Sequence, residues 1–348
     1  MQVMRERILS GAKLALKFLF SFGILFYMVS TGRLDLAVVK RGFSEVHLLG
    51  ASVGLVLMAM FFSLYRWRLL LGGLSLAYPF SEVVRYGMIG AFFNTTMPGA
   101  VSGDLIKAWY IVSDYKGQKK TPVLASILLD RVFGVFGLVI VSASPLFLNW
   151  NQVWSVPELR QLAWAVLALF IGVIFFFAYI LLSVWGPLRF MRAKMVGLEN
   201  NKFGKIFLDA YDSWISYGEQ PMVLVKALGL SVLTHVCIVL VVILCSRALG
   251  DGQIAPFQYF LLVPMGLLTT AIPIAPAGLG VGHVAFAALF SLAGSSHGAE
   301  IFTMLVTIQI LLNLTGIRDC DLHLQLRHSF ALLSRTYMYL PQQIHHYE

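Results

Sequence analysis

The sequence predicts an all-α polytopic membrane protein, and three observations support that fold class. Of the 348 residues, 58% are hydrophobic and only 12% are charged, whereas soluble proteins carry roughly 25% charged residues. Several apolar stretches reach the about 20 residues that a helix needs to cross the hydrocarbon core of a bilayer. These stretches lack the strict alternation of barrel strands, so a helical bundle is favoured over a barrel.

Hydrophobic regions follow one another along the chain, and we count eight. Six are uninterrupted, and we predict that they are full transmembrane spans at about 14–31, 46–65, 122–148, 161–186, 222–247 and 300–317. The other two, at about 83–112 and 257–294, are interrupted by Pro and Gly. We predict that these two are re-entrant hairpins, each of which enters and leaves the membrane on one side.

The distribution of Lys and Arg predicts the orientation. If the N-terminus is cytoplasmic and both hairpins are re-entrant, most of the 26 Lys and Arg residues lie in cytoplasmic segments, and the outer loops hold only Arg33, Lys40, Arg41 and Arg160. Positive charge is typically concentrated on the cytoplasmic side of membrane proteins. An alternative with eight full crossings would place Lys116, Lys119 and Lys120 outside, and the charge rule disfavours it. We therefore expect a multi-pass protein of the bacterial inner membrane with both termini in the cytoplasm.

The remaining segments fit a single membrane domain. We predict one integral-membrane domain over residues 1–317 and a cytoplasmic tail over 318–348, where the apolar pattern stops. Basic residues precede the first apolar run as in a signal peptide, but no small-x-small cleavage site follows, so we expect an uncleaved span. Residues 202–220 are polar and aromatic and predict an amphipathic helix at the cytoplasmic membrane surface. The net charge of +9 is attributed to the orientation bias and to anionic lipid, and not to nucleic acid.

The two interruptions share one pattern. The first reads Gly99-Ala-Val-Ser-Gly103-Asp104, the second reads Gly278-Leu-Gly-Val-Gly282-His283, and a proline lies just upstream of each. The offset is 179 residues (278 minus 99), and the same offset carries Asp130 onto Gln309. Matched broken segments in two halves of a transporter indicate a substrate site. We therefore predict an inverted repeat with halves at about 46–148 and 222–317, although G-x-x-x-G is also a common helix-packing motif.

Polar residues at the breaks and within the spans are the candidate site. Charges inside a bilayer are costly, so Asp130 and Arg131 need partners, and Arg131 is predicted to pair with Asp104 or with a lipid phosphate. A purely structural ion pair remains the alternative for these residues, and a buried neutral imidazole is the alternative for His283. Gln309 and Asn313 share a helix face and either line a cavity or bond neighbouring helices. The predicted substrate-binding residues are Asn94, Gly99, Gly103, Asp104, Lys107, Asp130, Arg131, Gly278, Gly282, His283 and Gln309.

Signatures of catalysis and of metal binding are missing from the sequence. It contains no P-loop, G-x-S-x-G or H-E-x-x-H motif and no paired-carboxylate cluster. The three cysteines form no C-x-x-C or Cys/His cluster, so we expect neither a metal site nor a disulfide framework. We expect no cofactor, no catalytic residue and no enzymatic activity.

Four segments in order resemble the membrane region of bacterial lysylphosphatidylglycerol synthases, the flippase part of the multiple peptide resistance factor. They are YRWRLLL (65–71), PGAVSGDLIKAW (98–109), ASILLDRVFG (125–134) and PIAPAGLGVGH (273–283). The resemblance covers about residues 10–317 and implies a helical bundle that moves or binds lipids, aminoacylated phosphatidylglycerol in the best-understood members. In this resemblance, Asp104 corresponds to the acidic residue at the first break of the family, and Arg131 corresponds to the arginine of the family's Asp-Arg motif. Three features depart from the pattern of the family: His283 stands where Glu is usual, the sequence after Gly316 does not continue as in the family, and the aminoacyltransferase pattern is not found. We therefore expect that this chain does not make the lipid.

Together these observations predict a lipid translocator of the bacterial inner membrane, with a phospholipid or polyprenyl-phosphate headgroup bound between the two hairpins. The predicted partners are membrane lipids that carry an anionic phosphate, with no nucleic acid. The sequence leaves open a homodimer and a partner enzyme of envelope synthesis. Two other classes remain as alternatives. One is an integral-membrane enzyme that uses Asp104 or His283 as a base on a lipid carrier, and the other is an accessory subunit of a synthase.

Overall fold

The computed structural model describes residues 19–96, 102–114, 120–185, 208, 216–252, 254–270 and 276–317. All regular elements in these ranges are helices, which confirms the predicted all-α class. After a helix over Leu19–Ser30, the order is α2 (Leu36–Ser44), α3 (Val46–Gly73), α4 (Phe80–Thr96), α5 (Ser102–Asp114), α6 (Lys120–Leu148), α7 (Trp150–Ser155), α8 (Pro157–Trp185), α11 (Pro221–Ala248), α12 (Pro256–Thr270), the 3₁₀ turn η2 (Pro276–Gly278), α13 (Val281–Ser291) and α14 (Gly298–Leu314).

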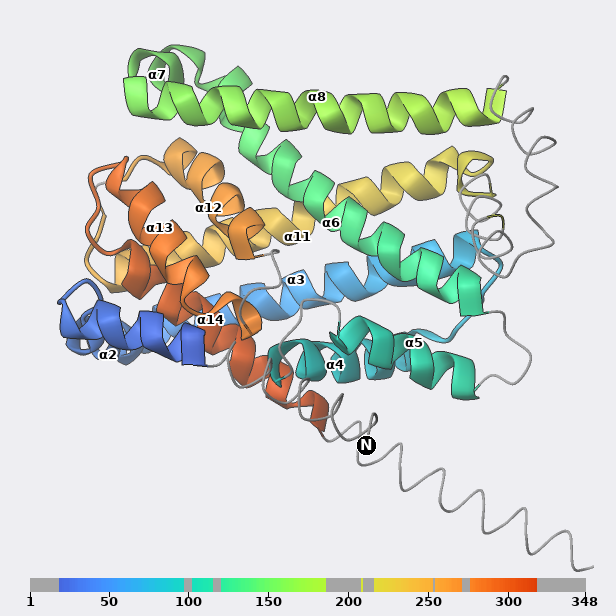
Figure 1. Ribbon diagram of the computed structural model, residues 1–348, viewed down its shortest axis with the longest axis horizontal. Helices are drawn as coiled ribbons and strands as arrows, with labels where there is room; N and C mark the ends of the chain where they lie inside the picture. The colour runs from blue at the N-terminus through green and yellow to red at the C-terminus, as the bar shows by residue number, and fades with distance from the viewer. Residues whose placement is uncertain are drawn as a thin grey trace, which may run out of the picture.

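Long apolar helices form the frame of the molecule. Four described helices, α3, α6, α8 and α11, are long and apolar enough to cross a membrane. In Figure 1, α3, α8 and α11 run along the long axis and α6 crosses obliquely between them. Their outer faces expose large apolar side chains, among them Phe61, Leu128, Phe175 and Leu233. Such faces are stable in contact with lipid tails, and they indicate a multi-pass membrane protein.

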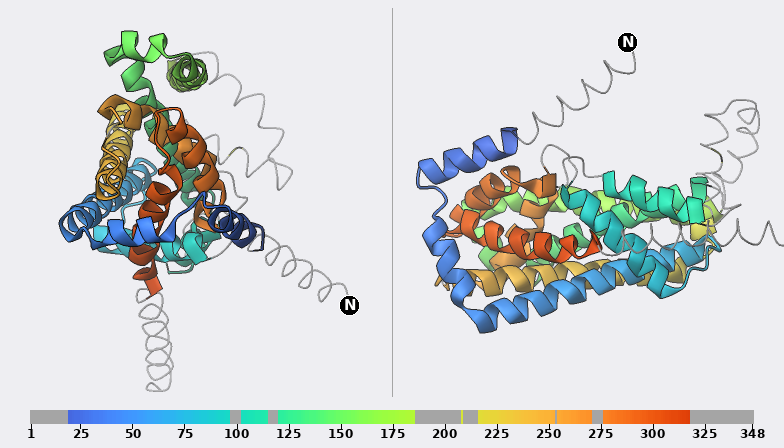
Figure 2. Two further views of the ribbon diagram at one scale, coloured as in Figure 1. Left: turned by 90° about the vertical axis from the view of Figure 1, so that its left-hand side faces the viewer. Right: turned by 90° about the horizontal axis from the view of Figure 1, so that it is seen from below.

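Each interrupted region forms a pair of helices that pack on each other. In the first region α4 packs against α5, and in the second α12 packs against α13. The two pairs lie toward opposite ends of the long helices (Figures 1 and 2). The second break needs left-handed backbone, with φ of +71° at Gly278 and +83° at Gly280. Glycine adopts this conformation without a side-chain clash, so these two glycines allow the chain to reverse before α13.

Several span boundaries differ from the sequence prediction. The span predicted at 46–65 continues as α3 to Gly73, the span at 161–186 begins at Pro157, and the last span is α14, of 17 residues. At 1.5 Å per residue, α14 is shorter than the about 30 Å of a hydrocarbon core. The first span is described only from Leu19. Gly99, the tail 318–348 and most of the predicted surface helix 202–220 lie outside the described residues.

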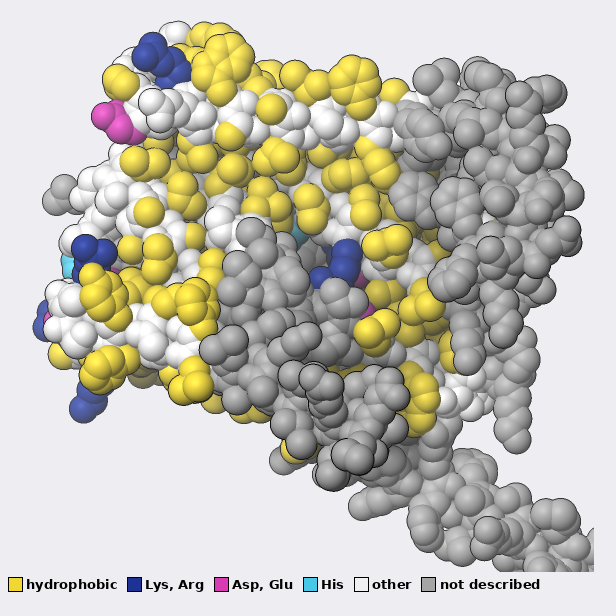
Figure 3. Space-filling model, viewed as in Figure 1, with side chains coloured by type: hydrophobic (Ala, Val, Ile, Leu, Met, Phe, Trp, Pro, Cys, Tyr) yellow, Lys and Arg dark blue, Asp and Glu magenta, His cyan; other side chains and the backbone are white. Residues whose placement is uncertain are grey.

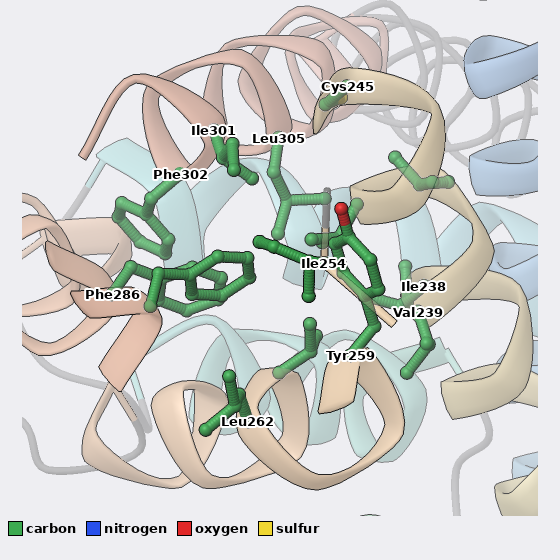
Figure 4. Close-up of a cluster of buried hydrophobic side chains, with 14 of the residues drawn as sticks. Ile238, Val239, Cys245, Ile254, Tyr259, Leu262, Phe286, Ile301, Phe302 and Leu305 are labelled. Carbon is green, nitrogen blue, oxygen red and sulfur yellow. The ribbon is translucent and has the colours of Figure 1, made fainter. Parts of the chain in front are cut away.

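Two apolar cores hold the helix pairs against the frame. The larger core joins α11, α12, α13 and α14, and Figure 4 shows Tyr259, Phe286 and Phe302 pointing into it. The second core joins α4 and α5 to α3 and α6 through fully buried side chains that include Trp67, Tyr86 and Ile111. Trp67 also forms part of a cavity wall, so this second core directly supports the candidate site.

Candidate functional site

A cavity of about 400 Å³ lies among α3, α4, α5, α6, α11 and α14. Its volume falls in the range of small-ligand sites. In Figure 3, basic side chains (dark blue) lie in a depression of an otherwise largely apolar face. This depression lies over the region where α6 passes α4 and α5 in Figure 1. The polar side chains that line it are Ser63, Arg66, Asn94, Asp104, Lys107, Asp130, Arg131, His235 and Asn313. We call this the charged cavity.

Arg66 forms the inner wall of the charged cavity. It lies on α3 and is only 5% exposed. Its Nε donates to Asp130 Oδ1 at 2.7 Å, and its Nη1 donates to Ser231 Oγ at 2.7 Å. These bonds tie α3 to α6 and to α11. The sequence analysis ended the span at residue 65, just before Arg66, whereas α3 continues past it, and Asp130 supplies the charge that allows the burial of Arg66.

The second ion-paired group stands on α5 and α6. Asp104 accepts a hydrogen bond from the Nε of Arg131, as the sequence analysis predicted. Lys107 Nζ lies 3.6 Å from Asp104 Oδ1 and 3.8 Å from the centroid of the Trp67 ring. Lys107 is thus buried in a cation–π contact. The Arg131 side chain is 37% exposed, so it stands at the mouth of the cavity.

The α4–α5 pair positions Asp104 through an unusually close backbone contact. A Cβ atom built on Gly103 would overlap the carbonyl oxygen of Gly90 and lie 2.7 Å from the backbone nitrogen of Asn94. Asn94 Oδ1 accepts a hydrogen bond from the N–H of Gly103 at 2.9 Å. This bond satisfies one of the free N–H groups of the first turn of α5. Asn94 and Gly103 therefore fix the start of the helix that carries Asp104 and Lys107.

Two side chains complete the wall from the second half of the chain. Asn313 on α14 donates to Thr95 Oγ1 at 2.9 Å, so it both lines the cavity and bonds a neighbouring helix. His235 on α11 places Nε2 2.9 Å from the carbonyl oxygen of Gly134. Sequence reasoning missed Arg66 and His235 as site residues. The available signal was an ionisable residue within or beside an apolar stretch, which predicts function by default.

The side chains that line the charged cavity carry a net positive charge. Its lining carries the cations Arg66, Lys107 and Arg131 and the carboxylates of Asp104 and Asp130. With a neutral His235, three cations against two carboxylates leave one net positive charge. Within the described part of the chain, no hydrogen bond to the Nη groups of Arg131 is observed. The arrangement therefore attracts a monoanionic group to the mouth of the cavity.

The predicted residues of the second break lie elsewhere. His283 is 1% exposed; its Nδ1 accepts from the N–H of Gly280 at 3.2 Å and its Nε2 lies 3.0 Å from Thr303 Oγ1. A Cβ on Gly282 would overlap the ring of Phe302, which is the close packing that G-x-x-x-G permits. None of Gly278, Gly282, His283 and Gln309 lines the charged cavity. The structure thus brings together Asn94, Asp104, Lys107, Asp130 and Arg131, places Gly103 directly behind them, and leaves the second break apart.

Other cavities are larger and have fewer charged groups or a different balance of charge. One of about 760 Å³ between α6, α7 and α12 has no charged lining residue. Another of about 660 Å³ beside α2 and α14 is lined by Arg33 together with the carboxylates of Asp35 and Glu300. Within the described ranges, no group of three His, Cys, Asp or Glu residues could hold a metal ion. A third cavity, of about 460 Å³, is lined by Arg68 as its one charged side chain. The charged cavity differs from these by its cluster of three cations, two carboxylates and a histidine.

Comparisons with known proteins agree with the motif resemblance. A family model described as the lysylphosphatidylglycerol synthase TM region matches residues 14–314. No curated protein matches the chain. The matched range includes every residue of the charged cavity and both helix pairs.

Proposed function

The chain belongs to the family of lysylphosphatidylglycerol synthase transmembrane regions, and from this premise we propose that it is a lipid translocator that binds a lipid phosphate in the charged cavity. The family is a membrane region with a lipid-related role. The observation that carries the proposal is the exposed Arg131 guanidinium above a cavity with one net positive charge. A phosphodiester bears one negative charge, so its oxygens would neutralise the cavity.

The ion pairs leave part of the Arg131 guanidinium available to a phosphate. Arg131 binds Asp104 through Nε, which leaves the Nη end of its planar fork for a second acceptor. Arginine binds phosphate in this bidentate way. Arg66 is held by Asp130 and Ser231 deeper in the wall. We therefore assign phosphate contact to Arg131 and Lys107, and structural support of the wall to Arg66.

The positions of the helix pairs support alternating access. The α4–α5 pair lies toward one end of the long helices, and α12–α13 lies toward the other end, together with α2 and α7 (Figure 1). In the predicted orientation α2 and α7 are on the outer side, so the hairpins would enter from opposite leaflets. In transporters built from inverted repeats, the two halves rock against each other around a central site. We propose the same for this chain, in the bacterial inner membrane.

Two variants test this function in reconstituted vesicles. When the full-length protein is reconstituted in liposomes, it should move a fluorescent phospholipid from the inner to the outer leaflet. An external quencher then lowers the fluorescence of the lipid that has moved. Because charge-assisted hydrogen bonds contribute about 1.5–3 kcal/mol, Arg131→Ala should lower the apparent affinity for anionic lipid roughly 10- to 100-fold and abolish this movement. Arg160→Ala is the matched control, because this arginine is exposed on α8, away from the cavity. Unchanged lipid movement with Arg131→Ala would refute the proposal.

The enzyme alternative has less geometric support. It requires Asp104 or His283 as a general base, and a base needs a free acceptor near the substrate. Asp104 is bound by Arg131 and Lys107, and both ring nitrogens of His283 have partners outside the cavity. Product formation by the purified protein with a lipid donor would reinstate this alternative. Stable co-purification with a synthase, without transport by the chain alone, would favour an accessory subunit.

A further inference from the structure

His235 has only one of its two ring nitrogens satisfied. It lies on α11 in the wall of the charged cavity, with Nε2 2.9 Å from the carbonyl oxygen of Gly134. Its Nδ1 is buried, and no described residue forms a hydrogen bond with it. Buried polar atoms in proteins normally have a partner. This atom is therefore a place where the cavity is incomplete without a further group.

The partner of Nε2 fixes the chemistry of Nδ1. A carbonyl oxygen can only accept, so Nε2 carries the proton. In a neutral imidazole the other nitrogen then presents a lone pair and acts as an acceptor. Leaving such an acceptor unpaired in a buried position is unfavourable, so a bound molecule with a hydrogen-bond donor gains by reaching it.

The charged groups of the cavity do not fill this role. Arg66, Lys107 and Arg131 can only donate. The carboxylates of Asp104 and Asp130 are each already bound by an arginine. Among the side chains that line the cavity, His235 Nδ1 is the buried acceptor to which no described residue donates a hydrogen bond.

We propose that His235 is a specificity-determining residue, and that the cavity selects an anionic phosphodiester lipid whose headgroup carries a hydroxyl. The phosphate would lie at Arg131, and the hydroxyl would donate to His235 Nδ1. The charge argues for a hydroxyl over an ammonium group, because a zwitterionic headgroup would leave the net positive charge of the cavity in place. This inference rests on the proposed lipid-binding function and adds the class of headgroup to it.

A matched pair of lipids tests the inference without any variant. Phosphatidylglycerol and phosphatidylpropanol with identical acyl chains share the phosphodiester, its charge and a three-carbon headgroup, and they differ only in hydroxyls. Competition between them for the purified full-length protein can be followed by native mass spectrometry. We expect the wild-type protein to prefer phosphatidylglycerol about tenfold, because a buried site built for a hydroxyl discriminates against an analogue that lacks it.

Two substitutions assign the preference to His235. His235→Phe keeps a ring of similar size without the acceptor, and the preference should fall to less than about twofold while the affinity for phosphatidylpropanol is unchanged. His235→Gln restores a donor toward Gly134 and an acceptor toward the cavity, and it should retain most of the preference. Equal binding of the two lipids by the wild type, or an unchanged preference in His235→Phe, would overturn the inference while leaving phosphate binding in place. If neither lipid competes better than phosphatidylcholine, the proposed function itself fails.

Discussion

Replacing one partner of the Arg66–Asp130 ion pair should destabilise the protein much more than replacing both. The two side chains are only 6% and 14% exposed, with 2.7 Å between Nε and Oδ1. Truncating either partner leaves the other as a buried, unpaired charge, which typically costs about 3–5 kcal/mol. A double replacement by apolar residues leaves no charge and costs about 0–2 kcal/mol, part of it from Ser231, which loses its donor.

A double-mutant cycle measures this difference. Arg66→Met, Asp130→Leu and the double variant are unfolded reversibly in mixed detergent and dodecyl sulfate micelles, with tryptophan fluorescence as the probe. The sum of the single losses should exceed the loss of the double variant by about 4 kcal/mol or more. Arg160→Met, at an exposed arginine, should change stability by no more than about 0.5 kcal/mol. Additive losses would show that the two residues do not stabilise each other and would refute the account of how α3 buries its arginine.

Other contacts give sharper local predictions. Gly103→Ala should destabilise the α4–α5 pair by about 3 kcal/mol or more, because the new methyl group overlaps the backbone of Gly90. Gly172→Ala is the control, since a Cβ at this position meets no neighbouring atom within 4 Å. Thermal unfolding in detergent compares the two, and equal midpoints would contradict the backbone contact. Asn313→Leu should cost about 1 kcal/mol through its lost bond to Thr95, and Thr95→Val should add little to it. Independent, additive losses in the same assay would argue that this bond is absent.

The sequence predicted those parts of the fold that depend on local pattern. Long apolar runs determine helices, and proline with glycine marks a break, so four membrane-length helices and both helix pairs were predictable. The end of α3 was not predictable in this way. Hydropathy drops at Arg66, although the helix continues for two more turns. What allows it to continue is Asp130, which lies 64 positions away, and single-sequence reasoning cannot place two such residues together.

The site was predicted in part for the same reason. Arg131 was recognised because a charge in a membrane is costly without a partner, and Asp104 because it follows the first G-x-x-x-G; the structure pairs the two. The matching offset of the two breaks extended the prediction to His283, which does not line the charged cavity. Gly282 packs against Phe302 and His283 bonds Thr303. The last glycine of the pattern thus packs on an aromatic ring at the second break, whereas Gly103 packs on the α4 backbone behind the charged cavity. The pattern specifies close backbone approach, and the neighbouring helix decides its use.

The contact between Gly90 and Gly103 also limits the path of a lipid. The backbones of α4 and α5 touch there without space for even a methyl group, so an acyl tail cannot slide through the hairpin. A lipid whose headgroup occupied the charged cavity would therefore keep its acyl tails outside the hairpin, on the side where Arg131 is exposed. Tail length and saturation should then have little influence on recognition, and the protein would sort lipids by their heads alone.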